Sequence, residues 1–239
     1  PSLYRIKRTI SLTMNRINKI TTYCLLLTAY CLLPTANAGE YALDFLELDV
    51  GARECALGGA STSVPSPGFS SYWNPAGLAD KAHEFSLMHA SPFGLEDLDF
   101  LGLVVPAGRQ FGMGASLLRM GVSDISKFGE VIGTERIGEF GVSQGIAFVT
   151  FAVREKDIFV GCNLKYFKSK IDKLEGAGIG IDMGAIYRRG GFSLGVNLKD
   201  PFTSVIVYTS GSRDILRRDI RCGLSYKLNF TKGGVLLSY

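Results

Sequence analysis

The stretch DIFVGCNLKYF, residues 157–167, alternates between apolar residues and residues that are small or polar. Side chains of a β-strand point to the two faces of its sheet in turn, so the alternation sorts the residues by face. The apolar positions are Ile158, Val160, Cys162, Leu164 and Tyr166. The positions between them include Gly161, Asn163 and Lys165. The stretch therefore predicts a strand with one apolar face and one polar, glycine-containing face.

The same alternation recurs at residues 178–187, 192–199 and 219–228. The polar side of each run carries glycine together with a charged or amide side chain, namely Asp182, Asn197 and Arg221. Turn signals separate these runs from others of similar composition. The sequence predicts strands at 82–91, 97–106, 109–119, 140–153, 157–170, 175–188, 191–198, 214–228 and 232–239. The fold class that follows is all-β and antiparallel.

Two folds satisfy this alternation. A soluble sandwich turns its apolar faces toward a shared core, whereas a transmembrane β-barrel turns them toward lipid and its polar faces toward the lumen. Several runs are longer than the common soluble strand of about 5–6 residues and reach the length of a membrane span, about 9–11 residues. Glycine on the polar face also suits a tightly filled lumen. The sequence favours the barrel, with Lys165, Asp182, Asn197 and Arg221 facing the lumen and available to line a passage, and leaves an exported soluble β-sandwich binding protein as an alternative.

The first 38 residues resemble an export leader. Met14 is the expected start, Arg16 and Lys19 supply a basic region, residues 23–33 are apolar, and Ala36-Asn37-Ala38 forms a cleavage site. A membrane anchor is excluded because about a dozen apolar residues span about 18 Å as a helix, against a hydrocarbon core of about 30 Å. We expect a leader at 1–38 with cleavage after Ala38, a separate segment at 39–81 and a partial barrel at 82–239.

Cleavage would change the charge of the chain. The leader holds five basic residues and no acidic one, so removing it leaves 21 of the 26 Lys and Arg against 22 Asp and Glu, a net charge of −1. A chain without excess positive charge has no general attraction to phosphate backbones, so nucleic acid is not an expected partner.

Residues 51–79 carry a recognisable passage. It reads Gly51-Ala-Arg53, then ALGGA at 56–60, then YWNPAGLA at 72–79. The passage resembles the N-terminal signature of the PorV/PorQ family, which belongs to the FadL-like outer-membrane β-barrels. In that family the passage packs into the periplasmic mouth of the barrel as a plug. The signature residues carried over are Gly51, Arg53, Gly58, Gly59, Trp73, Asn74, Pro75 and Gly77.

The resemblance implies a barrel of about fourteen strands, within the range of outer-membrane barrels. About nine strands are predicted here, so we expect the sequence to be truncated at its C-terminus. Links 121–139 and 200–213 would be the outer loops.

The resemblance also implies a location and partners. The protein would reach the bacterial outer membrane through the general secretory pathway and contact outer-membrane lipid. A PorV-like component or shuttle of type IX protein secretion would contact secretion-system subunits and exported cargo proteins. A FadL-like channel for uptake of hydrophobic compounds is an alternative that rests on the shared architecture alone.

Catalytic and metal motifs are not supported by their surroundings. Residues 141–145 match G-x-S-x-G, but a β run follows, and the two histidines, His83 and His89, lie upstream. The glycine row at 176–184 precedes no helix that could bind a phosphate. Cysteines 55, 162 and 222 have no C-x-x-C spacing. We therefore expect no enzyme activity, no cofactor and no metal site.

Overall fold

The computed structural model describes residues 43–80, 83–128, 135–230 and 233–238. The predicted leader, residues 1–38, lies outside the described residues. Among those that are described, no helix has the length and apolar character needed to cross a membrane.

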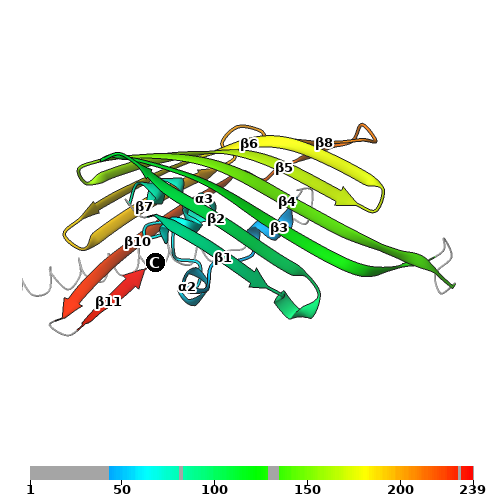
Figure 1. The fold of residues 1–239 in the computed structure, drawn as a ribbon, viewed down its shortest axis with the longest axis horizontal. Coiled ribbons are helices and arrows are strands. Elements are labelled where there is room, and N and C mark those ends of the chain that lie inside the picture. The colour runs from blue at the N-terminus through cyan, green and yellow to red at the C-terminus, as the bar shows by residue number, and fades with distance from the viewer. Residues whose placement is uncertain (1–42, 81–82, 129–134, 231–232, 239) are drawn as a thin grey trace, which may run out of the picture. The chain divides into compact units, whose positions relative to one another are not determined.

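The described residues form one antiparallel sheet of eleven strands. Nine of them follow the order β1-β2-β3-β4-β5-β6-β7-β10-β11, while β8 pairs with β6 and β9 with β8. The sheet curls into an open half-barrel (Figure 1). Within the described residues no pairing joins β1 to β11, so no closed barrel is seen. The strands are β1 Glu84–Ala90, β2 Asp97–Ala107, β3 Phe111–Phe128, β4 Arg136–Glu155, β5 Ile158–Ile171, β6 Leu174–Arg189, β7 Phe192–Lys199, β8 Val205–Tyr208, β9 Arg213–Ile215, β10 Asp219–Phe230 and β11 Gly233–Ser238.

The nine strands predicted from the sequence match the nine along this order, but the long links differ from the prediction. Link 121–139 is largely strand, because β3 and β4 continue to pair beyond Val122 and Val142, with a register shift before Ile125 pairs with Phe140. Pairing satisfies the backbone groups of both segments, even though their side chains are mostly polar. Link 200–213 contains β8, and the predicted strand 214–228 is divided between β9 and β10.

The segment before the sheet consists of single turns of helix. They are η1 Asp44–Glu47, α2 Ala52–Ala56, η2 Pro67–Phe69, α3 Ser70–Trp73 and η3 Pro75–Ala79, with η4 Pro92–Gly94 between β1 and β2. Pro75 occupies the first turn of η3, where its missing N–H is no loss, and the Asn74 side chain accepts a hydrogen bond from the Ala76 N–H at 3.1 Å. We call residues 43–80 the packed segment.

The packed segment covers the polar, glycine-rich face of the sheet. Its α3 and η3 turns lie against β3, β4, β5 and β6, on the concave side (Figure 1). Tyr72, Trp73 and Leu78 are each 2% exposed. They pack against large side chains of the same sheet face, including Phe100, Phe159 and Phe167. The core of the protein therefore lies between this segment and the sheet.

The opposite face of the sheet is apolar and exposed. One row of directly paired positions crosses six strands: Phe85, Leu103, Ala115, Val149, Leu164 and Ile181. Its large members are open to solvent, with Phe85 63% exposed, Leu103 50% and Leu164 53%. The apolar residues of the sequence alternation thus face away from the core. We call this surface the outer apolar face.

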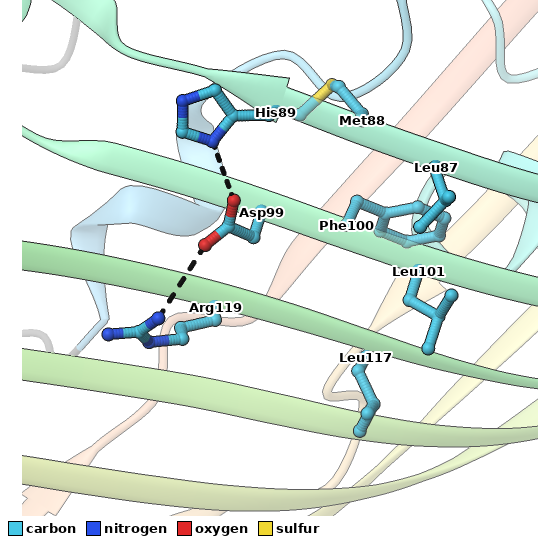
Figure 2. Close-up of a pocket in the computed structure, with 8 residues that line it drawn as sticks. All are labelled: Leu87, Met88, His89, Asp99, Phe100, Leu101, Leu117 and Arg119. Carbon is cyan, nitrogen blue, oxygen red and sulfur yellow. Dashed lines mark hydrogen bonds and ion pairs between the residues drawn. The ribbon is translucent and has the colours of Figure 1, made fainter.

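Charged residues begin where the outer apolar face ends. Figure 2 shows His89 of β1, Asp99 of β2 and Arg119 of β3 side by side, with Leu87, Leu101 and Leu117 one step along the same strands. His89 Nδ1 lies 2.8 Å from Asp99 Oδ1, and Arg119 lies 3.7 Å from the other carboxylate oxygen. The apolar surface therefore has a sharp polar boundary at this end of the strands.

Candidate functional site: the covered polar face

Asn74 joins the packed segment to the sheet. Its side chain is completely buried and donates hydrogen bonds to the carbonyl of Thr62 at 2.8 Å and to that of Val196 at 3.2 Å. A longer bond of 3.4 Å reaches the carbonyl of Ala185. One amide group thus holds η3 against both β6 and β7, and a buried amide satisfied in this way is a strong positional constraint.

Glycines allow the backbone of the packed segment to touch the sheet. Gly161 and Gly184 are directly paired on β5 and β6. A Cβ at Gly161 would lie 2.6 Å from the backbone N of Ala76, and one at Gly184 would overlap the Asn74 side chain. Along β6, Gly178 is equally close to the backbone of β8. The glycines of the sequence alternation therefore leave space for main chain to approach.

Tyr72 and Trp73 hold the first residues of the packed segment in place through side-chain hydrogen bonds. The Trp73 indole N–H donates to the carbonyl of Val50 at 2.7 Å, and the Tyr72 hydroxyl lies 2.5 Å from the carbonyl of Leu46. Burial raises the pKa of the Tyr72 hydroxyl, so it remains a donor. Asn197 of β7 donates to the carbonyl of Trp73 at 2.8 Å. Both aromatic residues therefore bury large surfaces while their polar atoms stay satisfied.

Lys165 lies at the centre of a buried charged cluster. Its ammonium is 2.6 Å from Asp182 and 2.5 Å from Asp200, and all three side chains are 3% exposed. Asn163 donates to Asp182 at 3.0 Å, and the Ser204 hydroxyl donates to Asp200 at 2.6 Å. Two carboxylates and one ammonium leave one formal negative charge, which these neutral donors and the Asp200 backbone N–H help to compensate.

Arg221 lies apart from this cluster. It donates to Asp219 at 2.6 Å and to Glu47 at 3.4 Å, and its guanidinium carbon is 5.8 Å from the centre of the Trp73 ring. Of the four residues assigned to a lumen, Lys165 and Asp182 share one cluster, Asn197 binds the packed segment, and Arg221 contacts its edge. All four lie on the face that the packed segment covers.

The other signature residues shape the packed segment itself. Gly51, Gly58 and Gly59 have φ values of 97°, 63° and 77°, in the left-handed region that glycine adopts most easily. Gly77 leaves room for Pro65 and the Ser70 hydroxyl. Arg53 donates to the buried carboxylate of Glu54 at 3.1 Å and to the carbonyl of Val64 at 2.9 Å.

Sequence reasoning did not identify Asp200 and Ser204 as members of the charged cluster. Both lie in link 200–213, which was predicted as an outer loop. Asp200 directly follows the last residue of β7, and alternation along a strand does not predict where the chain goes after the strand ends. Asn163 was placed on the polar face, but its partners Thr150 and Ser71 required the register of β4 and the position of α3.

The covered face is held together mainly by buried polar contacts. Asp182 and Asp200 bind Lys165 and neutral donors, the Ser193 hydroxyl donates to the carbonyl of Ser63, and the Lys199 ammonium lies 4.2 Å from the centre of the Tyr72 ring, whereas the hydroxyls of Ser61, Ser63 and Ser225 have no hydrogen-bond partner among the described residues. In the part of the chain that the structure describes, no three His, Cys, Asp or Glu side chains converge as metal ligands would. The arrangement supports a mechanical role, which is to keep the packed segment seated.

Replacing Gly161 with alanine should weaken the packing of the packed segment against the sheet. The new methyl group would meet the backbone of Pro75 and Ala76, and overpacking of this kind costs about 1–3 kcal/mol. We expect a lower midpoint of thermal unfolding and faster proteolysis within residues 43–80. Gly138→Ala in β4 is the matched control, because nothing lies within 4 Å of its Cβ position. Equal unfolding midpoints for the two variants would contradict the close approach.

Comparisons with known proteins found no match: no family model matches the chain, and neither a curated protein nor a solved structure is significantly similar to it.

Proposed function

We propose that this protein is a non-enzymatic outer-membrane scaffold whose outer apolar face contacts lipid. The observation that carries the proposal is the inversion of the sheet: large apolar side chains are exposed, and polar ones are covered. Water-soluble proteins rarely expose a continuous apolar surface of this extent. Strands of membrane barrels alternate in this sense, with apolar residues outward and polar residues inward.

The height of the apolar face is compatible with a membrane. From Ile158 to Tyr166 on β5, a rise of about 3.3 Å per residue gives roughly 26 Å, or roughly 19–22 Å across the membrane at a tilt of about 35–45°. Outer-membrane barrels have an apolar band of about 25 Å. Aromatic side chains lie near the end with the short turns, including Phe111, Tyr187 and Tyr226, which are 57%, 37% and 47% exposed. Such positions are favoured at the membrane interface.

A soluble sandwich is a poorer fit to the same face. A sandwich requires a second sheet packed on the apolar side, about 10 Å away. In the described residues the packed segment is on the polar side instead, and the apolar row through Leu103 and Leu164 stays exposed. No other part of the described residues covers the apolar face as the core of a sandwich requires.

The β3–β4 hairpin suits contact with other proteins. It continues past the apolar band as a paired ribbon, and its exposed apolar residues include Phe128 and Ile137, at 61% and 63%. In outer-membrane barrels the longer connections face the exterior. Together with the PorV-like signature, this supports a role as a component or shuttle in type IX secretion, with secretion-system subunits and cargo as partners.

The membrane assignment is tested on the full-length protein expressed with its leader. Outer membranes are isolated, and boiled and unboiled samples are compared on a detergent gel. We expect a membrane-bound band whose mobility changes only after heating, because a closed barrel resists detergent until it is heated. A soluble product with no mobility change would reject the proposal.

Shortening the β3–β4 hairpin tests the partner role. An Asn-Gly turn joining Val122 directly to Val142 would remove the extension, since this dipeptide favours a tight hairpin. We expect at least about a tenfold loss of cargo display at the cell surface, with the heat-dependent mobility unchanged. The substitution Gly190→Asn places the same dipeptide in the β6–β7 turn, where nothing lies within 4 Å of the Cβ position, and serves as control. Unchanged display after shortening would exclude the hairpin as the contact surface.

A further inference from the structure

A hollow opens on the outer apolar face at its polar boundary. It has a volume of about 440 Å³ and lies across β3, β4 and β5. Its lining combines small, apolar and basic residues. They are Leu117, Leu118, Arg119, Ser143, Gln144, Gly145, Ile146, Ala147, Tyr166, Lys168 and Lys170.

The strand register explains the hollow. Gly145 pairs directly with Arg119 on one side and Lys168 on the other, so a position without a side chain lies between two long cations. The next row toward the hairpin end places Ser143 beside Lys170. Gly145, Ser143 and these three cations therefore surround a space that is open to the outside.

The row on the other side of Gly145 is apolar. Ala147 pairs with Leu117 and with Tyr166, and this row begins the apolar band. Leu117 is 53% exposed and Tyr166 50%, so both walls project outward beside the small Ala147. The hollow thus offers positive charge at one end and a hydrocarbon-lined channel at the other.

The positive charge is only partly taken up by ion pairs. Arg119 lies 3.7 Å from Asp99, and Lys170 lies 3.1 Å from Glu175. Lys168 forms no ion pair with any other described residue. Asp97, in the row of Gly121 and Ser143, is a third acid on this face, so the formal charges of the boundary balance; Lys168 is the cation without an ion pair among the described residues, and its exposed ammonium is the donor most available to an anion.

We propose that this hollow binds a phosphate-bearing lipid, with its phosphate between Arg119, Lys168 and Lys170 and one acyl chain along Leu117, Ala147 and Tyr166. The proposal rests on the membrane location proposed above. Charge complementarity selects phosphate, because Arg and Lys are its usual protein donors. The adjoining apolar channel selects a lipid over free phosphate. Basic residues next to a membrane surface attract anionic lipid in the same way.

The test uses full-length protein in detergent micelles, with dimyristoyl phosphatidic acid as the probe and bound lipid counted by native mass spectrometry. We expect the triple variant R119Q/K168Q/K170Q to bind at least about tenfold less tightly. Gly145→Leu should lose binding to a similar extent without changing charge, because it fills the hollow while its Cβ meets only ordinary contacts. The triple variant K173Q/R213Q/R217Q removes equal charge from the β5–β6 turn, from β9 and from the link after β9, all outside the lining of the hollow, and should bind as the parent does.

Three outcomes overturn the proposal. Equal binding by all variants would show that the lipid is held without this hollow. Inorganic phosphate that binds as tightly as the lipid would make it a free-anion site. If dimyristoylglycerol, which lacks the phosphate, binds as tightly as dimyristoyl phosphatidic acid, the cations do not contribute to binding. Heat-dependent gel mobility is measured on every sample, so a failed lipid site in an intact barrel is distinguished from a protein that is not a membrane barrel.

Discussion

The double substitution Leu103→Arg with Leu164→Arg should prevent stable insertion of the protein into the outer membrane. Both leucines belong to the row that crosses the middle of the outer apolar face, and both are about half exposed, at 50% and 53%. Arginine on the lipid side of a barrel near the membrane centre costs about 2–4 kcal/mol. The two positions lie on β2 and β5, far enough apart for their costs to add. A total of about 4–8 kcal/mol rivals the whole stability of a typical domain, about 5–15 kcal/mol.

In a water-soluble protein the same double substitution would have little effect on stability. Changing an exposed surface leucine to arginine usually alters stability by no more than about 0.5 kcal/mol. The measurement is the fraction of protein recovered as a membrane-bound band with heat-dependent mobility. Leu95→Arg is the charge control, because Leu95 is 76% exposed but precedes β2, outside the apolar row. Normal recovery of the double variant would show that the outer apolar face does not meet lipid.

Lys165→Met should be the most damaging single change on the covered face. It removes the cation between Asp182 and Asp200 and leaves two buried carboxylates without their shared partner. Breaking a buried ion pair from one side costs about 3–5 kcal/mol. We expect a large fall in the urea concentration at the midpoint of unfolding, together with early release of the packed segment to protease.

Two comparisons separate charge from packing. Adding Asp182→Asn and Asp200→Asn to the Lys165→Met protein should recover much of the loss, because neutral amides of the same size remove the uncompensated charge. Lys170→Met is the exposed control: its ammonium pairs with Glu175 at 3.1 Å and is 55% exposed, and exposed pairs contribute about 0–1 kcal/mol. A Lys165→Met protein as stable as this control would contradict the role of the cluster.

The strands of the main order were predictable because their evidence is local. In residues 160–165 each apolar residue is followed by a small or polar one, and the structure places β5 there with its faces sorted accordingly, whereas Phe159 and Phe167 add two large side chains to the covered face. The β8–β9 hairpin was not predictable in the same way. Val205–Tyr208 is short, and its pairing with Gly176–Ile179 of β6 depends on glycines whose open side accepts another backbone.

The candidate site shows a similar division. Asn74, Pro75 and Trp73 were identified as signature residues through the resemblance of residues 51–79. Their partners are distant in the chain: Asn74 bonds to carbonyls of Ala185 and Val196, and Trp73 is held by Asn197. The Lys165 cluster likewise required Asp200 to return beneath the sheet. Contacts of this kind join residues that are distant in the chain, and a pattern among neighbouring residues does not predict them.

The sequence by itself determined the strand positions and which residues share a face, because alternation with a period of two is a property of neighbouring residues. The alternation alone left open which face would be covered; strand length and the glycines favoured the polar face, and only the tertiary structure decided which contacts cover it. An apolar face and a polar face are equally compatible with the alternation until something packs on one of them. Here the packed segment lies on the polar face, where Gly161 and Gly184 admit its backbone and Asn163, Lys165 and Asn197 meet its carbonyls or neighbouring charges. The apolar face is left outward because the covered face combines glycines that admit the main chain of the packed segment, polar groups that bond to it, and large side chains such as Phe159 and Phe167 that pack against its Leu78 and Trp73.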